Sequence, residues 1–344
     1  AAAAAAALWW CIRLLVPGSI PAWSGALAFA WSRTFWSQAL VAEVYTLNAL
    51  FFFVLLALIL QFLRCQDQSS PKATKLLLLS AFLAGLSFTN HWPLMVLASP
   101  GLIVLMLPYW KRLFRLSPAL ILLFALGLLP YLWMVYRSRQ AGVISFYGPI
   151  DSLSELLFIF LRKGYSGIDQ SGTDDLWDKL YFSVYFLRQI TIQMGLLGFA
   201  LAAIGLIFQA KHFGVRVSVA LMAGFACSSL LLIALLGFDY SPLYAAVFRV
   251  YPLVAYGIMA IWLALGLYLA SAWLAEKAPR LKEKQWQGGL GVLLLVPVLF
   301  AGWQHNDRSR FSYPCLLYTS PSPRDSTLDL VCRLLLEKGG GGGG

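Results

Sequence analysis

The sequence predicts an all-α membrane protein, a polytopic transmembrane helical bundle of about eight to ten spans. Of its 344 residues, 60% are hydrophobic and only 12% are charged, and the mean hydropathy is +0.74. Water-soluble domains of this size do not have such a composition. Apolar runs approach or exceed the roughly 20 residues that a helix needs to cross the hydrocarbon of a bilayer. Lysine and arginine gather in every second connection between these runs.

Ten apolar segments are candidate spans, and the clearest is 44–63. Two segments precede it, 1–16 and 22–42, and the second carries Arg33 and Gln38. The others follow it along the chain: 76–89, 94–110, 116–136, 190–209, 217–238, 250–274 and 288–303. Segments of this length and hydropathy predict helices that cross a membrane.

Short connections rich in lysine and arginine mark the cytoplasmic side of a membrane protein. Such connections lie at 64–75, 111–115, 211–216 and 277–284. The intervening connections are then on the opposite, outer side: 90–93, 137–189, 237–249 and the chain after 303. The formal net charge of +11 therefore reflects membrane topology. It predicts a lipid bilayer as partner and no nucleic acid.

The sequence divides into a transmembrane region, 1–303, which includes the outer loop 137–189, an outer tail, 304–314, and a final segment, 315–344. The final segment contains CLLYTSPSPRDS and closes with six glycines. These strings resemble translated adapter and polyguanine sequence, so we expect a non-native segment rather than a genuine disordered tail. The chain begins in an alanine run without an initiator Met. We expect that an N-terminal portion precedes it.

Motifs of common soluble enzymes are absent from the sequence. It has no cysteine pair with zinc or redox spacing, no glycine-rich phosphate loop, no G-x-S-x-G and no HExxH. The candidate functional residues are instead polar side chains at the outer ends of the predicted spans.

Arg33 and Glu43 lie on either side of a stretch rich in Trp, Ser and Gln, just before the span 44–63. Charges near hydrocarbon are costly unless paired or hydrated, so they often mark a binding site. The alternative is that Arg33 anchors the chain at the lipid headgroups and Glu43 begins a helix. Asn90 and His91, at the next outer turn, could bind a hydroxyl or a phosphate. The alternative, which the sequence favours, is that they are ordinary helix-ending residues.

The outer loop 137–189 is too long to be a simple turn. Ser152 and Glu155 have the spacing of a capping box, which predicts a short helix on the outer membrane surface that closes at Gly164. At its end, Arg162 and Lys163 could face a lipid-borne phosphate, or extend toward the headgroups as amphipathic side chains commonly do.

Three aspartates follow in the same loop: Asp174, Asp175 and Asp178. They could hold a divalent cation through oxygen ligands. The alternative, which the sequence favours, is that they start a helix over 176–188 by accepting hydrogen bonds from its free amides. In the next outer loop, Asp239 and Arg249 could form either a charge pair or part of a ligand site.

Two stretches carry a resemblance to a known family: SRTFWSQALVAEVYTLNALF at 32–51 and GLSFTNH at 85–91. They resemble multispanning bacterial proteins related to the transmembrane protein O-mannosyltransferase of the endoplasmic reticulum, within the glycosyltransferase C superfamily. The resemblance continues diffusely to about Trp303. It implies a glycosyltransferase C-like fold. It also implies transfer of a sugar, with mannose as the candidate, from a polyprenyl-phosphate donor to a protein or glycan acceptor on the non-cytoplasmic face.

The resemblance also implies which residues form the site. Glu43, Tyr45 and Asn48 match the family pattern A-E-V-Y-x-L-N, and Asn90 and His91 match its asparagine–histidine position. These residues are expected to form the donor and acceptor cavity. The cations expected to contact phosphate are Arg33, Arg162 or Arg249.

The catalytic residue is not identified by the resemblance, because the family's acidic residue is expected in an outer loop upstream of this chain. Glu43 is a substitute only if it faces the cavity. Trp92 and Pro93 depart from the family pattern after His91. No cofactor is assigned, and a divalent cation is the only candidate considered.

The predicted location is a bacterial inner membrane with a periplasmic active face, in preference to the endoplasmic reticulum with a lumenal one. Two other classes fit a helical membrane protein with outer polar residues. One is a transporter or flippase of a polyprenyl-linked or small polar substrate. The other is a non-enzymatic membrane subunit whose outer loop docks a partner.

Overall fold

A computed structural model of the chain describes residues 1–304 apart from 42, 66–69, 141–148 and 164–173, and for 301–304 it describes the backbone only. The described residues form helices and no β-strand, so the predicted all-α class is confirmed. Residues 305–344, which hold the predicted non-native segment and nearly all of the predicted outer tail, lie outside the described residues.

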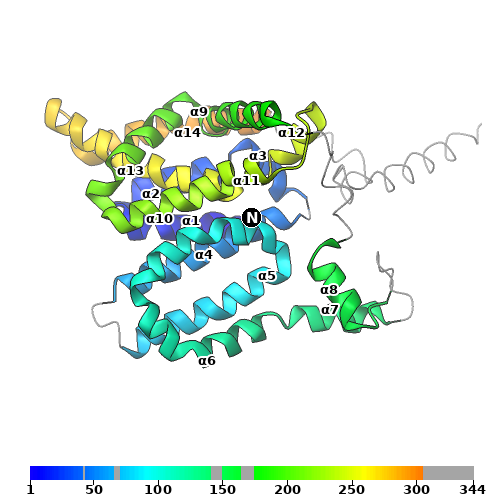
Figure 1. Ribbon diagram of the computed structural model, residues 1–344. Helices are drawn as coiled ribbons and strands as arrows, with labels where there is room; N and C mark the ends of the chain where they lie inside the picture. Colours follow the sequence, from blue (N-terminus) through cyan, green and yellow to red (C-terminus); the bar gives the residue numbers. More distant parts are fainter. Residues whose placement is uncertain (42, 66–69, 141–148, 164–173, 305–344) are drawn as a thin grey trace, which may run out of the picture.

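Figure 1 shows the arrangement of the helices. In chain order they are α1 (Ala2–Leu15), α2 (Ser19–Ala30), α3 (Arg33–Ala39), α4 (Val44–Leu63), α5 (Pro71–Met106), the short turn η1 (Leu107–Tyr109), α6 (Trp110–Gly127), α7 (Pro130–Ser138), α8 (Leu153–Phe160), α9 (Leu176–Phe213), α10 (Val215–Ala226), the π-helical segment η3 (Cys227–Leu231), α11 (Leu232–Leu235), α12 (Pro242–Phe248), α13 (Leu253–Lys277) and α14 (Glu283–Gln304).

Within the described residues, five helical stretches are long and apolar enough to cross a membrane: Val44–Leu63, Pro71–Ser138, Leu176–Phe213, Val215–Leu235 and Leu253–Lys277. The protein is therefore an integral membrane protein. This count does not confirm the predicted eight to ten spans. The predicted segment 44–63 coincides with α4, whereas 22–42 is divided between α2 and α3.

The helix α5 is a hairpin that folds back at His91, where the backbone leaves the helical region (φ −128°, ψ 75°). A straight helix of this length would place its ends about 54 Å apart. Instead, Arg112 just beyond α5 donates from Nη2 to Thr74 Oγ1 near its start at 2.7 Å. The rings of Phe62 and Tyr109, on either side of α5, are 5.0 Å apart. The outer turn predicted between 76–89 and 94–110 is thus present.

Two opposite ends of the bundle differ in composition. The basic end, at the left of Figure 1, is where α4, α9 and α13 end and where α6, α10 and α14 begin. The four predicted basic connections meet there. The site end, at the right of Figure 1, carries α3, α7, α8 and α12. The predicted alternation of connections is therefore present, while the membrane face that each end meets stays a prediction.

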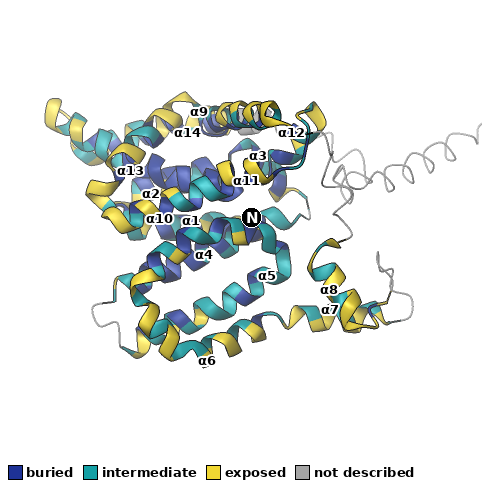
Figure 2. Ribbon diagram, in the orientation of Figure 1, coloured by how far each residue is buried: buried dark blue, intermediate teal, exposed yellow. Residues whose placement is uncertain are grey.

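The helix α13 forms the centre of the bundle, and every residue from 253 to 267 is buried. Figure 2 shows these buried residues between α2, α9 and α10, whereas α6, α7 and α8 carry mostly exposed or half-buried side chains. Glycines allow the closest helix approach: a Cβ on Gly205 of α9 would overlap the carbonyl of Trp262, and one on Gly266 would overlap Leu201. Small residues at such crossings are typical of membrane helix packing.

Candidate functional site

Buried polar side chains gather toward the site end. They come from α3, α4, α5 and α9: Ser32, Thr34, Gln38, Thr46, Asn48, Ser87, His91, Gln189 and Gln193. In a protein whose interior and exterior are both mostly apolar, buried polar groups are the informative feature. They locate the candidate site between the outer ends of these helices.

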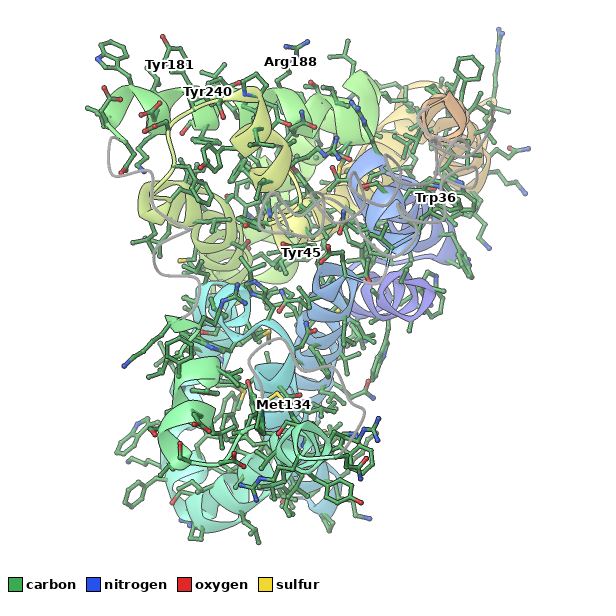
Figure 3. All side chains as sticks on the ribbon, turned by 90° about the vertical axis from the view of Figure 1, so that its right-hand side faces the viewer. Trp36, Tyr45, Met134, Tyr181, Arg188 and Tyr240 are labelled. Carbon is green, nitrogen blue, oxygen red and sulfur yellow. The ribbon has the colours of Figure 1, made fainter. Side chains whose placement is uncertain are left out.

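Tyr45, in the first turn of α4, lies at the middle of the site end (Figure 3). Its ring centroid is 6.0 Å from that of His91 at the fold of α5 and 5.7 Å from that of Tyr251 just before α13. Asn90 donates from Nδ2 to the carbonyl of Val44 at 2.9 Å, which fixes the fold of α5 against the start of α4. Three segments far apart in the sequence thus meet around one tyrosine.

The position of α3, and with it Arg33, is set by α9. Gln193 accepts a hydrogen bond from the Thr34 amide at 2.8 Å and donates to Thr34 Oγ1 at 2.6 Å. Gln193 also donates to Gln189 Oε1 at 3.3 Å. Because Thr34 is fully buried, this reciprocal pair satisfies groups that would otherwise be costly to bury. Arg33, the neighbouring residue, is half-buried at the N-terminus of α3.

Cations converge on Tyr185 of α9. The charges of Arg249, Arg33 and Arg188 act on its hydroxyl. The Tyr185 ring also packs against Phe248 at 6.4 Å, next to Arg249. Figure 3 shows Arg188 at the upper edge of the molecule, away from Tyr45, and its side chain is exposed. Guanidinium groups such as those of Arg33 and Arg249 are suited to binding an anion.

Four buried oxygens near the site have no hydrogen-bond partner among the described residues. They are Oδ1 of Asn48, a turn beyond Tyr45 on α4, the hydroxyl of Tyr256 on α13, Oγ of Ser32 and Oε1 of Gln38. Asn48 is 4% exposed and Tyr256 is fully buried. The Tyr256 hydroxyl interacts electrostatically with Tyr185 and Arg249. Unsatisfied buried polar atoms are rare in native proteins and favour a functional explanation.

Arg162 lies apart from this cluster, at the end of α8. The predicted capping box is present: Ser152 accepts from the Glu155 amide, and the Glu155 side chain accepts from the Ser152 amide. The prediction that the helix closes at Gly164 is wrong, because α8 ends at Phe160 and Arg162 takes the left-handed conformation (φ 56°). The charge of Arg162 acts on the Tyr131 hydroxyl of α7.

The aspartates of the outer loop start a helix, as the sequence favoured. Asp175 caps α9 and forms a capping box with Asp178. Asp174 pairs with Lys179 at 2.7 Å. Across the described ranges, no group of three or more His, Cys, Asp or Glu residues is arranged to hold a metal ion. Asp239 and Arg249 lie on either side of the short helix α12, and their role as a charge pair or as part of a ligand site stays a prediction.

An apolar groove with a volume of about 390 Å³ lies within the bundle and begins about one helical turn from the fold of α5. Its walls come from α4, both arms of α5 and α6. Ser87 and Phe88, a turn before His91, bound its outer end, and Leu107, Trp110 and Leu113 bound the end nearer the basic end. The groove therefore runs along the membrane-spanning helices beside the polar residues. This combination suits an amphiphile with a polar head and an apolar chain.

Most of the predicted site residues come together. Glu43, Tyr45, Asn48, Asn90 and His91 lie on the touching ends of α4 and α5, and Arg249 and Arg33 approach from α12 and α3. Only Arg162 belongs to a separate element.

Sequence reasoning missed Tyr251, Tyr185, Tyr256 and Arg188. Tyr251 could have been found as the first aromatic residue after Arg249 at an outer end. The others lie within long apolar or amphipathic stretches and carry no local signal.

The helices and the polar end define a class, an integral membrane protein of the polytopic all-α type with an anion-suited site beside an apolar groove. Within that class, the first third of the chain is similar to the protein O-mannosyl-transferase TMEM260 family. The family described as "Protein O-mannosyl-transferase TMEM260 N-terminal domain" matches residues 2–114. That range includes most of the predicted site residues: Arg33, Glu43, Tyr45, Asn48, Asn90 and His91.

Two curated relatives carry the same name. The chain is 24% identical over 210 residues to protein O-mannosyl-transferase tmem260 of Dictyostelium discoideum, covering 56% of this chain and 25% of the relative. It is 29% identical over 140 residues to protein O-mannosyl-transferase TMEM260 of Mus musculus, covering 40% of this chain and 20% of the relative. The matches span about a quarter or less of each relative's length. No solved structure shows a significant match.

Proposed function

We propose that the chain is a membrane glycosyltransferase, or the membrane part of one, that moves a sugar from a polyprenyl-phosphate donor to a hydroxyl acceptor at the site end. The names of the relatives suggest mannose as the sugar and a protein as the acceptor. The proposed face is the non-cytoplasmic one, since the basic connections lie at the opposite end. The observation that carries the proposal is that the polar residues around Tyr45 and His91 lie about one helical turn from the outer end of an apolar groove.

The arginines serve the phosphate in this proposal. The charges of Arg249, Arg33 and Arg188 all act on Tyr185, and Arg33 and Arg249 are the two that the sequence assigns to the site. Guanidinium groups bind phosphate oxygens through paired N–H donors and keep their charge at all relevant pH values. They would stabilise the phosphate as negative charge develops on the departing oxygen. The apolar groove would hold the polyprenyl chain, since its walls are almost wholly hydrocarbon.

The transfer itself exchanges one bond at the anomeric carbon of the sugar. The acceptor oxygen forms a bond to that carbon, the bond from the carbon to the donor phosphate oxygen breaks, and the phosphate leaves with the electron pair. The acceptor proton passes to a base. Glu43 is the carboxylate in the predicted set, at the N-cap position of α4 and two residues before Tyr45. We assign it this role within the proposal.

Glu43→Gln tests the assignment. In nanodiscs, with polyprenyl-phosphate mannose and a serine-containing peptide, we expect turnover to fall on the order of 100-fold, since a positioned base contributes about that much. Thermal stability should change little. Glu276→Gln is the matched control, because Glu276 lies near the basic end of α13. Equal turnover in Glu43→Gln and the parent chain would remove Glu43 from the mechanism.

The same assay separates the other classes. Saturable binding of the donor with no transfer, together with movement of the donor across a sealed vesicle, would indicate a transporter or flippase. If the chain shows no donor binding and no transfer, the proposed function is rejected and a non-enzymatic subunit is left.

A further inference from the structure

The outer helix α8 has few contacts with the rest of the protein. Its side chains are largely exposed, including Leu153 at 71% and Phe158 at 40%. A cavity of about 380 Å³ separates part of it from α6 and α7. A helix of eight residues is not stable alone. Its position therefore depends on the few specific contacts at its two ends.

At its C-terminal end, three aromatic residues form a clasp: Trp92 of α5, Tyr131 of α7 and Phe160 of α8. Trp92 donates from Nε1 to the Phe160 carbonyl at 2.7 Å and stacks on its ring at 6.0 Å and 17°. The Tyr131 ring meets the Phe160 ring edge-on at 5.5 Å. The last carbonyls of a helix lack partners within it, so the Trp92 indole satisfies one of them.

Tyr131 joins the clasp to α5 a second time. Its hydroxyl donates to the carbonyl of Phe88 at 2.9 Å, one turn before His91. Trp92 itself directly follows His91, whose ring contacts Tyr45. The clasp thus connects α8 to the fold of α5 that forms the candidate site.

Arg162 follows the clasp by two residues. Of the non-glycine residues that the structure describes, Arg162 alone has a positive φ, 56°. Side chains with a Cβ rarely adopt this conformation, and an observed outlier of this kind favours a functional reason. Its charge acts on the hydroxyl of Tyr131, a member of the clasp. The clasp therefore holds the end of α8, two residues before Arg162.

We propose that Trp92 is a positioning residue: through the clasp it fixes the end of α8 against the fold of α5, so that Arg162, which lies apart from the other arginines, binds the phosphate of a polyprenyl-phosphate substrate from the α8 side. The proposal rests on the proposed function for the chemistry of the ligand. It explains the tryptophan that departs from the family pattern after His91. One structural unit then consists of the Trp92 indole, the Phe160 carbonyl that it binds, and Arg162 in its left-handed conformation.

The contact is tested without any ligand by hydrogen exchange. In Trp92→Phe the stacking is retained and the hydrogen bond to the Phe160 carbonyl is lost. We expect the amides of Leu161 and Arg162, which bond to Leu157 and Ile159, to exchange about two- to tenfold faster, as loss of one net hydrogen bond implies. Unchanged exchange would overturn the clasp.

The matched control breaks the contact at the other end of α8. Arg139 donates to the carbonyl of Ile150 at 2.9 Å and pairs with Asp151 at 3.4 Å. Arg139→Gln should speed exchange near the start of α8 and leave Leu161 and Arg162 unchanged.

A double-mutant cycle tests the action through Arg162. Binding of polyprenyl phosphate in nanodiscs is measured for the parent chain, Trp92→Phe, Arg162→Gln and the double variant. We expect each single variant to raise the Kd about three- to tenfold, and the double variant to be no weaker than Arg162→Gln alone, because Trp92 acts through Arg162. The pair Arg139→Gln and Arg162→Gln should instead show independent effects.

The outcomes separate this proposal from the proposed function. Additive effects of Trp92→Phe and Arg162→Gln, or unchanged binding in both, would overturn the positioning role. A parent chain that binds polyprenyl phosphate, with non-additive effects of Trp92→Phe and Arg162→Gln on the Kd, but that transfers no sugar would reject only the proposed transferase function. Where transfer is measured, a rise in KM with unchanged kcat in Trp92→Phe supports positioning, while a fall in thermal stability with unchanged KM contradicts it.

Discussion

Asn48 keeps a carbonyl oxygen in the interior of the protein with no hydrogen-bond partner among the described residues. Burial without a partner costs free energy, so a residue of this kind lowers stability unless a ligand supplies the missing bond. A sugar hydroxyl is a donor that could satisfy the Asn48 oxygen.

Removal of the unsatisfied Asn48 oxygen should affect thermal stability and donor affinity in opposite directions. In Asn48→Leu, the thermal midpoint should stay unchanged or rise, while affinity for polyprenyl-phosphate mannose should fall about tenfold, the value of one hydrogen bond at the upper end of its range. Calorimetry and ligand titration measure the two quantities. A loss of stability with unchanged affinity would make Asn48 a structural residue.

The matched control is Gln209→Leu. Gln209 is also buried, but it accepts a hydrogen bond from Trp262 Nε1 at 2.8 Å, away from the site. Removing its amide leaves the indole donor unsatisfied and should lower stability by about 1–3 kcal/mol. Donor affinity should not change.

Single residues also show how far sequence reasoning reaches. The sequence alone identifies four of the candidate residues, Glu43, Tyr45, Asn90 and His91, because they stand at the ends of apolar runs, where a polar side chain is conspicuous. Tyr185 and Tyr256 were not, since their roles depend on the crossing of α9 with α12 and α13. Such crossings are set by long-range packing that no local pattern contains.

At the scale of elements, α8 was predicted by a pattern that the structure confirms. The backbone amides of Asp151 and then Ser152 donate to the Glu155 carboxylate and hold its pKa below the ordinary value of 4.5, with a smaller contribution from the charge of Arg139. The C-terminal end of α8 was predicted less well, because the left-handed residue is Arg162 rather than a glycine.

The lowered pKa of Glu155 implies a pH dependence of α8. A carboxyl group with a lowered folded pKa stabilises the folded form fully above its unfolded pKa, and this contribution is lost as the pH falls through the folded pKa. We therefore expect the first turn of α8 to loosen below about pH 4.5. An NMR titration of the Glu155 carboxyl should give a midpoint below that value. Ser152→Ala should raise the midpoint, and a midpoint at or above 4.5 in the parent chain would contradict the capping box.

The crossing of α9 and α13 depends on glycine because the two helix backbones approach each other closely there. In Gly205→Ala the new Cβ would overlap the Trp262 carbonyl, so we expect a loss of about 1–3 kcal/mol of stability. Gly289→Ala is the control, because a Cβ there meets nothing within 4 Å and alanine favours a helix. Thermal unfolding in detergent measures both. Equal stability of the two variants would mean that this crossing can move apart at little cost.

At the scale of the whole molecule, the order of helices brings distant segments to one end. Alternating basic connections in the sequence predicted which ends of α4, α5 and α13 lie together, and the bundle in Figure 1 has that arrangement. The sequence could not predict the groove, because its walls come from α4, two arms of α5 and α6. Each wall residue is an ordinary apolar side chain of a membrane helix.

The groove leads to a prediction that distinguishes a chain-binding surface from general contact with lipid. Ala81 lines the groove, and Leu79, two residues away on the same arm of α5, is 46% exposed outside it. Ala81→Phe should fill part of the groove and weaken binding of long-chain polyprenyl phosphate about tenfold, which corresponds to about two methylene groups at 0.8 kcal/mol each.

Leu79→Phe should leave the affinity unchanged, because that side chain faces away from the groove. A short-chain isoprenyl phosphate separates the head from the tail: it places its phosphate at the arginines but does not reach Ala81, so its affinity should be the same in both variants and the parent. If Ala81→Phe weakened both ligands equally, the substitution would have disturbed the polar site, and the groove would not be the binding surface for the chain. If it weakened neither, the polyprenyl chain would lie elsewhere in the bilayer.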